Sequence, residues 1–124
     1  MKKYVAGLQH IGLPTLNIQK TIEFYEDLGF QVAWNTPDGK VAFLRLNDLT
    51  IETYQTDTTA GIAGAIDHIA LNVSDIEETF QWIKTCGYTL LDQEIDSRPF
   101  WENGVRFFNI LGPNGEKIEF GQII

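Results

Sequence analysis

The chain has a single cysteine, Cys86, among 124 residues, so it can form neither an intrachain disulfide nor a cysteine-based metal cluster. Basic residues are also scarce, with nine Lys and Arg against 17 Asp and Glu and a formal net charge of −8. This balance disfavours nucleic acid and anionic membrane surfaces as partners, because both would be repelled. We therefore expect a small-molecule substrate as the partner, with no nucleic acid and no membrane.

Long apolar runs are absent as well. No stretch approaches the roughly 20 residues that span a bilayer, and the apolar run before Gln9 and His10 is too short for a secretory signal. Together with the single cysteine, these features predict a cytoplasmic protein. A hydrophobic fraction of 44% predicts a globular chain with one core, or with two small cores that share an interface.

The two histidines of the chain open nearly the same phrase. His10 begins HIGL and His68 begins HIAL. The segments 10–30 and 68–88 align without a gap and also share a second Ile, a Thr and a Gly. The chain is therefore an internal duplication.

Each half also closes on a matching Ile-Glu pair, which ends in Glu52 in the first half and in Glu119 in the second. A symmetric fold would bring two imidazoles and two carboxylates together. A lone strand histidine is more often structural, but four equivalent positions favour a shared role. Imidazole and carboxylate suit Zn, Ni, Co, Mn or Fe(II), so the sequence predicts that His10, Glu52, His68 and Glu119 bind one divalent metal ion.

The same order of elements is expected in both halves. Short strands are predicted over 7–14 and 65–73, with the histidines on one face by alternation. A helix follows each of them. The first is capped by Asn17, the second by a capping box of Ser74 and Glu77, and they end at Gly29 and Gly87. Extended segments come next, at 30–36, 40–47, 49–55, 88–95, 104–111 and 116–123.

These elements predict an α+β fold of two tandem βαβββ modules, at about 5–55 and 65–124, joined by a polar, glycine-rich linker over 56–64. The second module is nine residues longer between its His and its Glu. Most of the extra length falls near 96–104, which contains Phe100 and Trp101. This segment is either a surface loop with its aromatic side chains in the core or a flap over a pocket.

Four phrases carry a resemblance to a known family: LQHIGL at 8–13, IEFYEDLGF at 22–30, DHIALNV at 67–73 and PNGEKIEF at 113–120. With the duplicated plan, they resemble the vicinal oxygen chelate superfamily. Its members include glyoxalase I, fosfomycin-resistance proteins, methylmalonyl-CoA epimerase, extradiol dioxygenases and bleomycin-resistance proteins. The resemblance covers nearly the whole chain. It is specific for the superfamily and much less specific for a reaction.

The resemblance implies that each module curls into a cup and that two cups pair into a single-domain, metal-centred cleft. His10, Glu52, His68 and Glu119 match the ligand set of glyoxalase I, which implies a lyase or isomerase that moves a proton next to a metal-chelated carbonyl. Glu119 is then the candidate general base, with Glu52 as its counterpart. Small members of the superfamily often complete the cleft between chains, which implies a homodimer.

Two positions depart from glyoxalase I. Pro14 stands where those enzymes have an arginine that contacts glutathione, and Thr56 stands where they have an asparagine with the same task. The thiol partner is therefore open. Arg45, Arg98 and Arg106 are alternative contacts for an anionic substrate, and each is equally compatible with an ordinary surface position.

Three other functions compete with the lyase or isomerase. A fosfomycin-type enzyme and an extradiol dioxygenase would each use His10, His68 and Glu119, and in both Glu52 would occupy a coordination position that the substrate needs. A binding protein of the bleomycin-resistance kind would use the acidic surface and a groove lined by aromatic residues such as Trp34, Phe100 and Trp101. That function has no need of four metal-type ligands.

Overall fold

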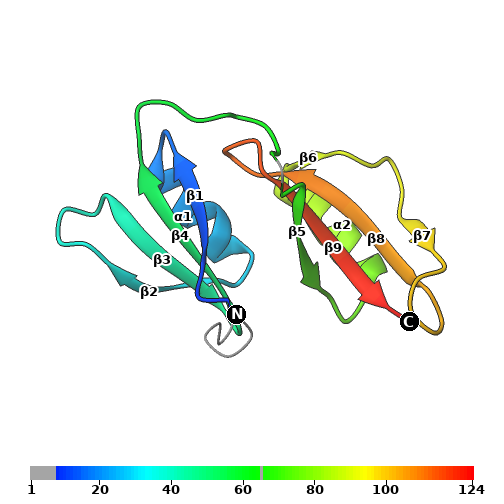
Figure 1. Cartoon of the computed structure of the whole chain (residues 1–124). Coiled ribbons are helices and arrows are strands. Elements are labelled where there is room, and N and C mark those ends of the chain that lie inside the picture. Colours follow the sequence, from blue (N-terminus) through cyan, green and yellow to red (C-terminus); the bar gives the residue numbers. More distant parts are fainter. Residues whose placement is uncertain (1–7, 65) are drawn as a thin grey trace. The chain divides into compact units, whose positions relative to one another are not determined.

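The computed structural model describes residues 8–64 and 66–124, so the predicted beginnings of the two modules, residues 5–7 and residue 65, lie outside the described residues. The chain forms two compact units that divide between Thr59 and Ala60. Figure 1 labels their elements, and each unit is described by itself.

The described part of the first unit, residues 8–59, contains five elements. They are the strand β1 (Ile11–Thr15), the helix α1 (Ile18–Asp27) and the strands β2 (Gln31–Asn35), β3 (Val41–Leu46) and β4 (Leu49–Gln55). The sheet has the order β1-β4-β3-β2, in which β1 runs parallel to β4 and the other neighbours are antiparallel. The first and last strands of the unit therefore lie side by side.

The second unit repeats this plan. Its elements are β5 (His68–Asn72), α2 (Ile76–Cys86), β6 (Thr89–Leu90), β7 (Asp96–Arg98), β8 (Val105–Leu111) and β9 (Lys117–Ile123). The sheet has the order β5-β9-β8-β6, with β5 parallel to β9, and β7 also pairs with β8. The predicted α+β fold of repeated strand and helix modules is confirmed.

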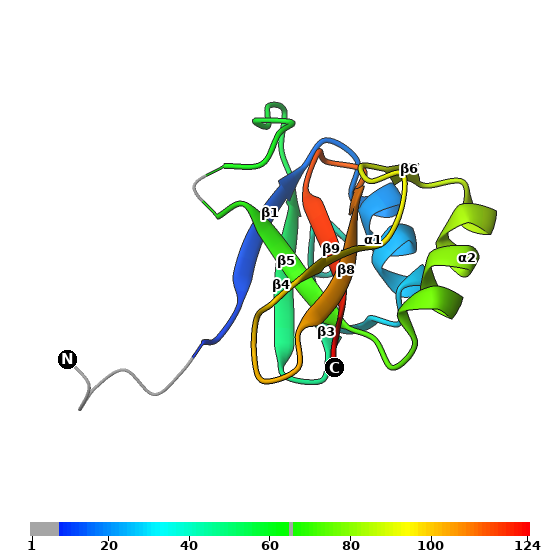
Figure 2. The same cartoon turned by 90° about the vertical axis from the view of Figure 1, so that its right-hand side faces the viewer.

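A helix packs on one face of each sheet, as Figure 2 shows for α2 against β8 and β9. Alternation along β8 and β9 places Phe108, Ile110 and Ile118 on the helix side, where each is fully buried. Phe80 of α2 packs edge-on against Phe108, with ring centroids 4.9 Å apart. The helix covers only one face of each sheet, and Glu52 and Glu119 lie on the other face.

Helix ends agree with the sequence in part. The side chain of Asn17 caps α1 by accepting a hydrogen bond from the backbone N–H of Lys20, and Gly87 ends α2 at a φ of 76°. The predicted capping box of Ser74 and Glu77 is wrong. Asp75 caps α2 by accepting from the N–H of Glu78, and Glu77 instead pairs with an arginine of β8.

The strand predicted over 88–95 is also wrong in extent, because β6 ends at Leu90. Two residues later, the carboxylate of Asp92 accepts hydrogen bonds from the backbone N–H and the side-chain amide of Asn109, at 2.7 and 2.9 Å. A side chain thus replaces the backbone ladder at this point, and pairing with β8 resumes only at Asp96. No helix among the described residues is long and apolar enough to cross a membrane.

Candidate metal centre

The first predicted pair meets in the first unit. His10 directly precedes β1, and Glu52 lies on the neighbouring β4, opposite Gly12. Alternation along the strand puts His10 and Gly12 on the face of the sheet that carries Glu52. The Nε2 atom of His10 lies 4.0 Å from Oε2 of Glu52, and the two side chains are 31% and 29% exposed. They are thus partly shielded and still accessible to a ligand.

The second pair repeats this geometry in the second unit. His68 begins β5, and Glu119 lies on the parallel strand β9, opposite Ala70. The Nε2 atom of His68 lies 3.5 Å from Oε2 of Glu119, and these side chains are 38% and 21% exposed. The duplication of the sequence is therefore matched by a duplicated contact between an imidazole and a carboxylate.

The opposite nitrogen of each ring is held by the residue just before it. Nδ1 of His10 lies 2.9 Å from Oε1 of Gln9, and Nδ1 of His68 lies 2.8 Å from Oδ2 of Asp67. Both partners offer an oxygen acceptor, so a neutral ring that donates its Nδ1–H to that oxygen has its lone pair on Nε2. In that tautomer each lone pair lies on the nitrogen nearer the glutamate.

Metal-binding histidines usually donate their other ring N–H to a carboxylate, a carbonyl or water, which fixes the ring and raises its basicity. The structure shows this arrangement at both histidines. Sequence reasoning missed Gln9 and Asp67, although a hydrogen-bonding residue precedes the histidine in both copies of the repeat. That shared feature was the available signal.

Asp67 has a second partner, because Nζ of Lys117 lies 3.1 Å from the same Oδ2 atom. The hydrogen bond from His68, and after it the one from Lys117, hold the pKa of Asp67 below its usual range. The carboxylate that holds His68 is therefore ionised at neutral pH. Gln9 is uncharged, so the side chain that holds the ring of His10 is neutral, whereas the one that holds the ring of His68 is charged.

Two of the four predicted ligands meet in each unit, and neither unit gathers three His, Cys, Asp or Glu side chains as a metal site among the residues described. A four-ligand set would need one pair from each module. The donor chemistry fits a divalent ion, because each pair offers an imidazole nitrogen beside a carboxylate, and an oxygen holds the other nitrogen of the ring.

Small residues leave space beside both carboxylates. A Cβ atom on Gly12 would meet only a ring carbon of Tyr54, at 3.9 Å. A Cβ atom on Gly121 would lie 3.5 Å from Oε1 of Glu119, so Gly121 keeps that oxygen uncovered on one side. Pro14 follows Gly12 on the same face and has no polar side chain, so it provides no contact for a substrate carboxylate there.

The neighbours of the two glutamates differ across the sheet. Phe43 stands opposite Glu52, whereas Asn109 stands opposite Glu119. Asn109 is 7% exposed, and its amide group is oriented by Asp92, since a carboxylate can only accept. Its Oδ1 atom is buried without a hydrogen-bond partner among the described residues. The first module is thus aromatic at this position and the second is polar.

Of the three candidate arginines, one lies on the helix side of its sheet. Arg106 pairs with Glu77 of α2, so it lies on the helix side of its sheet, away from Glu119. Arg45 lies on the same face as Phe43 and donates to the hydroxyl of Thr50 at 3.2 Å. Arg98 donates to Asp96 at 2.8 Å. Of the three, Arg106 is the least suited to contact a substrate at Glu119, because it lies on the opposite face of that sheet.

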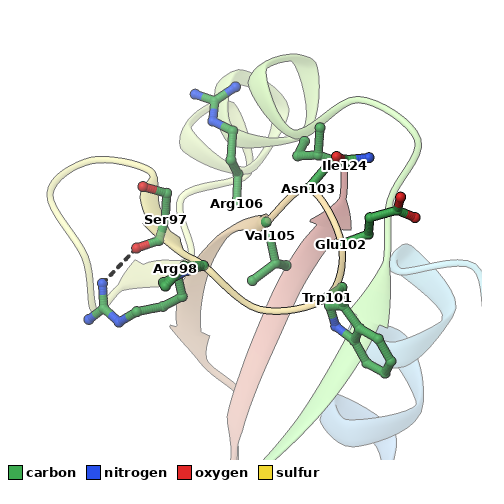
Figure 3. A pocket seen from close by; sticks show the side chains of 10 residues that line it. Ser97, Arg98, Trp101, Glu102, Asn103, Val105, Arg106 and Ile124 are labelled. Atoms are coloured by element: carbon green, nitrogen blue, oxygen red, sulfur yellow. Dashed lines mark hydrogen bonds between the residues drawn. The ribbon is translucent and has the colours of Figure 1, made fainter.

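The turn between β7 and β8 exposes its aromatic residues. Phe100 is 57% exposed and Trp101 is 73% exposed, so the interpretation that places these side chains in the core is wrong. Trp101 has a φ of 62°, which is unusual for a bulky residue. Figure 3 shows Trp101 on the rim of a pocket of about 560 Å³, which is also lined by Arg98, Val105 and Ile124.

Known proteins are similar to this chain along almost all of its length. A relative in Bacillus subtilis (strain 168), the uncharacterized protein YwbC, is 32% identical over 126 residues, which is 93% of this chain and 96% of the relative. An integron cassette protein from the mobile metagenome of V. cholerae has a similar structure, with 17% identity, a TM-score of 0.75 and 97% of each chain covered.

A lactoylglutathione lyase from Agrobacterium tumefaciens is similar in fold, with 16% identity, a TM-score of 0.68 and coverage of 96% of this chain and 95% of that one. At such identities the two solved structures show the fold alone. The family model of the Glyoxalase/Bleomycin resistance protein/Dioxygenase superfamily matches residues 7–120. The two-module fold, its paired histidines and glutamates and this match show that the chain belongs to that superfamily.

Proposed function

We propose that His10, Glu52, His68 and Glu119 together bind one divalent metal ion and that the protein is a lyase or isomerase of the glyoxalase type. The observation that carries the proposal is the doubled pair of His and Glu in which an oxygen holds Nδ1 of each ring. Such support is what a metal-binding imidazole requires. A structural histidine has no need for the same support in both modules.

A divalent ion bound by these residues would act as a Lewis acid toward two adjacent oxygens of a substrate. The chain itself supplies the proton transfer. Glu119 is the proposed base, because its carboxylate is partly shielded and Gly121 leaves Oε1 open on one side. Glu119 takes the proton and returns it to the neighbouring atom of the substrate, and Glu52, which holds the equivalent position in the first module, is its proposed counterpart.

The presence of both glutamates favours this function over the alternatives. Glu52 approaches His10 much as Glu119 approaches His68, which supports four protein ligands rather than the three used by fosfomycin-type enzymes and extradiol dioxygenases. A binding protein without a metal would not need either pair. The similarity in fold to a lactoylglutathione lyase agrees with the proposal, while Pro14 leaves the thiol partner open.

Metal analysis of the purified protein after dialysis against divalent ions tests the site. Wild type is expected to hold one ion for each set of the four proposed ligands, and His68→Ala is expected to lose most of this bound metal. Glu102→Gln, a change of an exposed carboxylate on the turn between β7 and β8, serves as the control and should keep the ion. Equal, near-zero occupancy in all three proteins would overturn the proposal.

The role of Glu119 is tested separately, with methylglyoxal and a panel of thiols as substrates. Glu119→Gln keeps an oxygen donor and removes the base, so it should keep measurable metal and lose about 10²–10⁴ in rate. A metal-loaded variant with the rate of wild type would place the base elsewhere, and Glu52→Gln would be the next variant to measure.

The assembly and the compartment belong to the same proposal. We infer a homodimer, because two modules per chain must complete a cleft and a two-fold contact between copies does so economically. The chain has one cysteine and a strongly acidic composition, which agree with a role in the cytoplasm on a small molecule.

A further inference from the structure

Strand β2 contains an irregularity that changes the direction of one large side chain. Val32 stands opposite Leu44, and Trp34 stands opposite Phe43, with a register shift between them. In an unbroken strand, Trp34 would lie on the same face as Val32 and opposite Ala42. The extra residue of the bulge instead turns Trp34 to the face that carries Phe43.

The two faces of this sheet have different surroundings. Ala42 and Leu44 are fully buried on the helix side, whereas Phe43 stands opposite Glu52 on the other side. The bulge therefore moves Trp34 from the face of the core to the face of the proposed metal ligands. Bulges often re-aim a side chain in this way beside a functional site.

Trp34, Phe43 and His10 form a continuous row of rings. The centroids of Trp34 and Phe43 lie 6.0 Å apart at an interplanar angle of 56°. Those of Phe43 and His10 lie 5.6 Å apart at 89°. The row thus leads from the edge strand of the sheet to the imidazole that approaches Glu52.

Packing within the fold does not account for this row. Trp34 is 58% exposed, so much of a large apolar side chain is left uncovered where burial would stabilise the protein. The repeat does not require it either, because Asn109 takes the place of Phe43 in the second module and is buried against Asp92. The aromatic surface is thus particular to the first module and adjoins its His and Glu.

We infer that Trp34 and Phe43 form a subsite for a planar, apolar group of the substrate, attached next to the two oxygens that chelate the metal. Rings of a ligand pack on such side chains in offset or edge-on arrangements and gain affinity beyond the area that they bury. The inference rests on the proposed function and narrows its substrate class to compounds that join an aryl or similar planar group to a vicinal pair of oxygens.

Two hydroxamates are suitable probes because both chelate through the same two oxygens. Acetohydroxamate has a methyl group, and benzohydroxamate has a phenyl ring in its place. Calorimetric titration of the zinc-loaded protein gives both affinities, and their ratio is compared between wild type and variants so that the intrinsic affinity of each probe for zinc cancels. Trp34→Ala should lower the affinity for benzohydroxamate about tenfold and leave that for acetohydroxamate nearly unchanged.

Two further variants sharpen the test. Trp34→Phe keeps an aromatic ring and should recover part of the ratio. Trp82→Ala removes another partly exposed tryptophan, 43% exposed on α2, and should leave the ratio at its wild-type value. Circular dichroism of each variant checks that the fold is retained.

The outcomes separate this inference from the proposed function. If acetohydroxamate binds the zinc-loaded protein and Trp34→Ala leaves the ratio unchanged, the subsite is refuted while chelation stands. If neither hydroxamate binds wild type after zinc loading, the chelating centre is refuted and the subsite falls with it. A ratio of the two affinities that drops in Trp34→Ala and not in Trp82→Ala supports both the subsite and the chelating centre.

Discussion

Replacing Asp67 by alanine tests whether the support of the histidine ring matters for metal binding. The Oδ2 atom of Asp67 is the acceptor for Nδ1 of His68 at 2.8 Å, and the variant removes it without changing either proposed ligand of the second module. The ring of His68 then loses the contact that fixes its tautomer and its orientation. We expect a weaker metal site in a protein that is still folded.

The expected loss is about tenfold in the dissociation constant for zinc. Supporting hydrogen bonds of this kind typically contribute 10- to 100-fold in affinity. The side chain of Asp67 is 61% exposed, so water can partly replace it, and the lower end of that range applies. Gln9→Ala should have a smaller effect, because Gln9 offers His10 a neutral oxygen rather than a carboxylate.

Competition with a chromophoric zinc chelator at pH 7.5 measures these constants. Lys117→Met is the matched control, since Lys117 donates to the same Oδ2 atom but is not a proposed ligand. It should leave zinc affinity at or slightly above the wild-type value. Wild-type affinity in Asp67→Ala, alongside a clear loss in His68→Ala, would refute the reasoning that the carboxylate orients the ring.

Three other predictions concern stability and assembly. Ile118→Ala should lower the free energy of unfolding by about 2–5 kcal/mol, since Ile118 is fully buried, whereas Ile123→Ala, at a half-exposed position, should cost much less in urea titrations followed by circular dichroism. Gly39→Ala should cost about 1 kcal/mol because φ is 72° in open space, and Gly115→Ala should cost more because its Cβ would overlap the carbonyl of Gly61. Equal losses at the two glycines would contradict that packing. Light scattering should give a mass near twice the 14.1 kDa of one chain, and a monomer at all concentrations would contradict the homodimer.

Most of the fold could be predicted from the sequence, because repetition and periodicity are local properties. The gapless alignment of 10–30 with 68–88 implied two copies of one plan, and the structure has two such sheets. The match of His10 with His68 and of Glu52 with Glu119 also predicted the same role for these residues in both modules. In the structure, the first and last strands of each module pair in parallel and bring one histidine and one glutamate together.

Prediction failed where a side chain competes with the backbone for hydrogen bonds. Asp92 binds Asn109 and ends the ladder that the apolar pattern of 88–95 would continue. Asp75 caps α2 one residue later than the capping box predicted. In both cases several polar groups near the element could have served as partner, and only the folded geometry selects one of them.

The sequence by itself determined the duplicated plan and the residue types of the candidate centre, because both follow from spacing along the chain. The tertiary structure decided which face of a sheet each remaining side chain takes. Alternation alone would place Trp34 on the helix side of its sheet, and a single extra residue in β2 reverses its face. Arg106 is directed to α2 by Glu77, which lies 29 residues earlier in the chain. The face that a strand residue takes after a bulge, and an ion pair between distant residues, both depend on which residues are neighbours in three dimensions. The order of residues along the chain does not specify those neighbours.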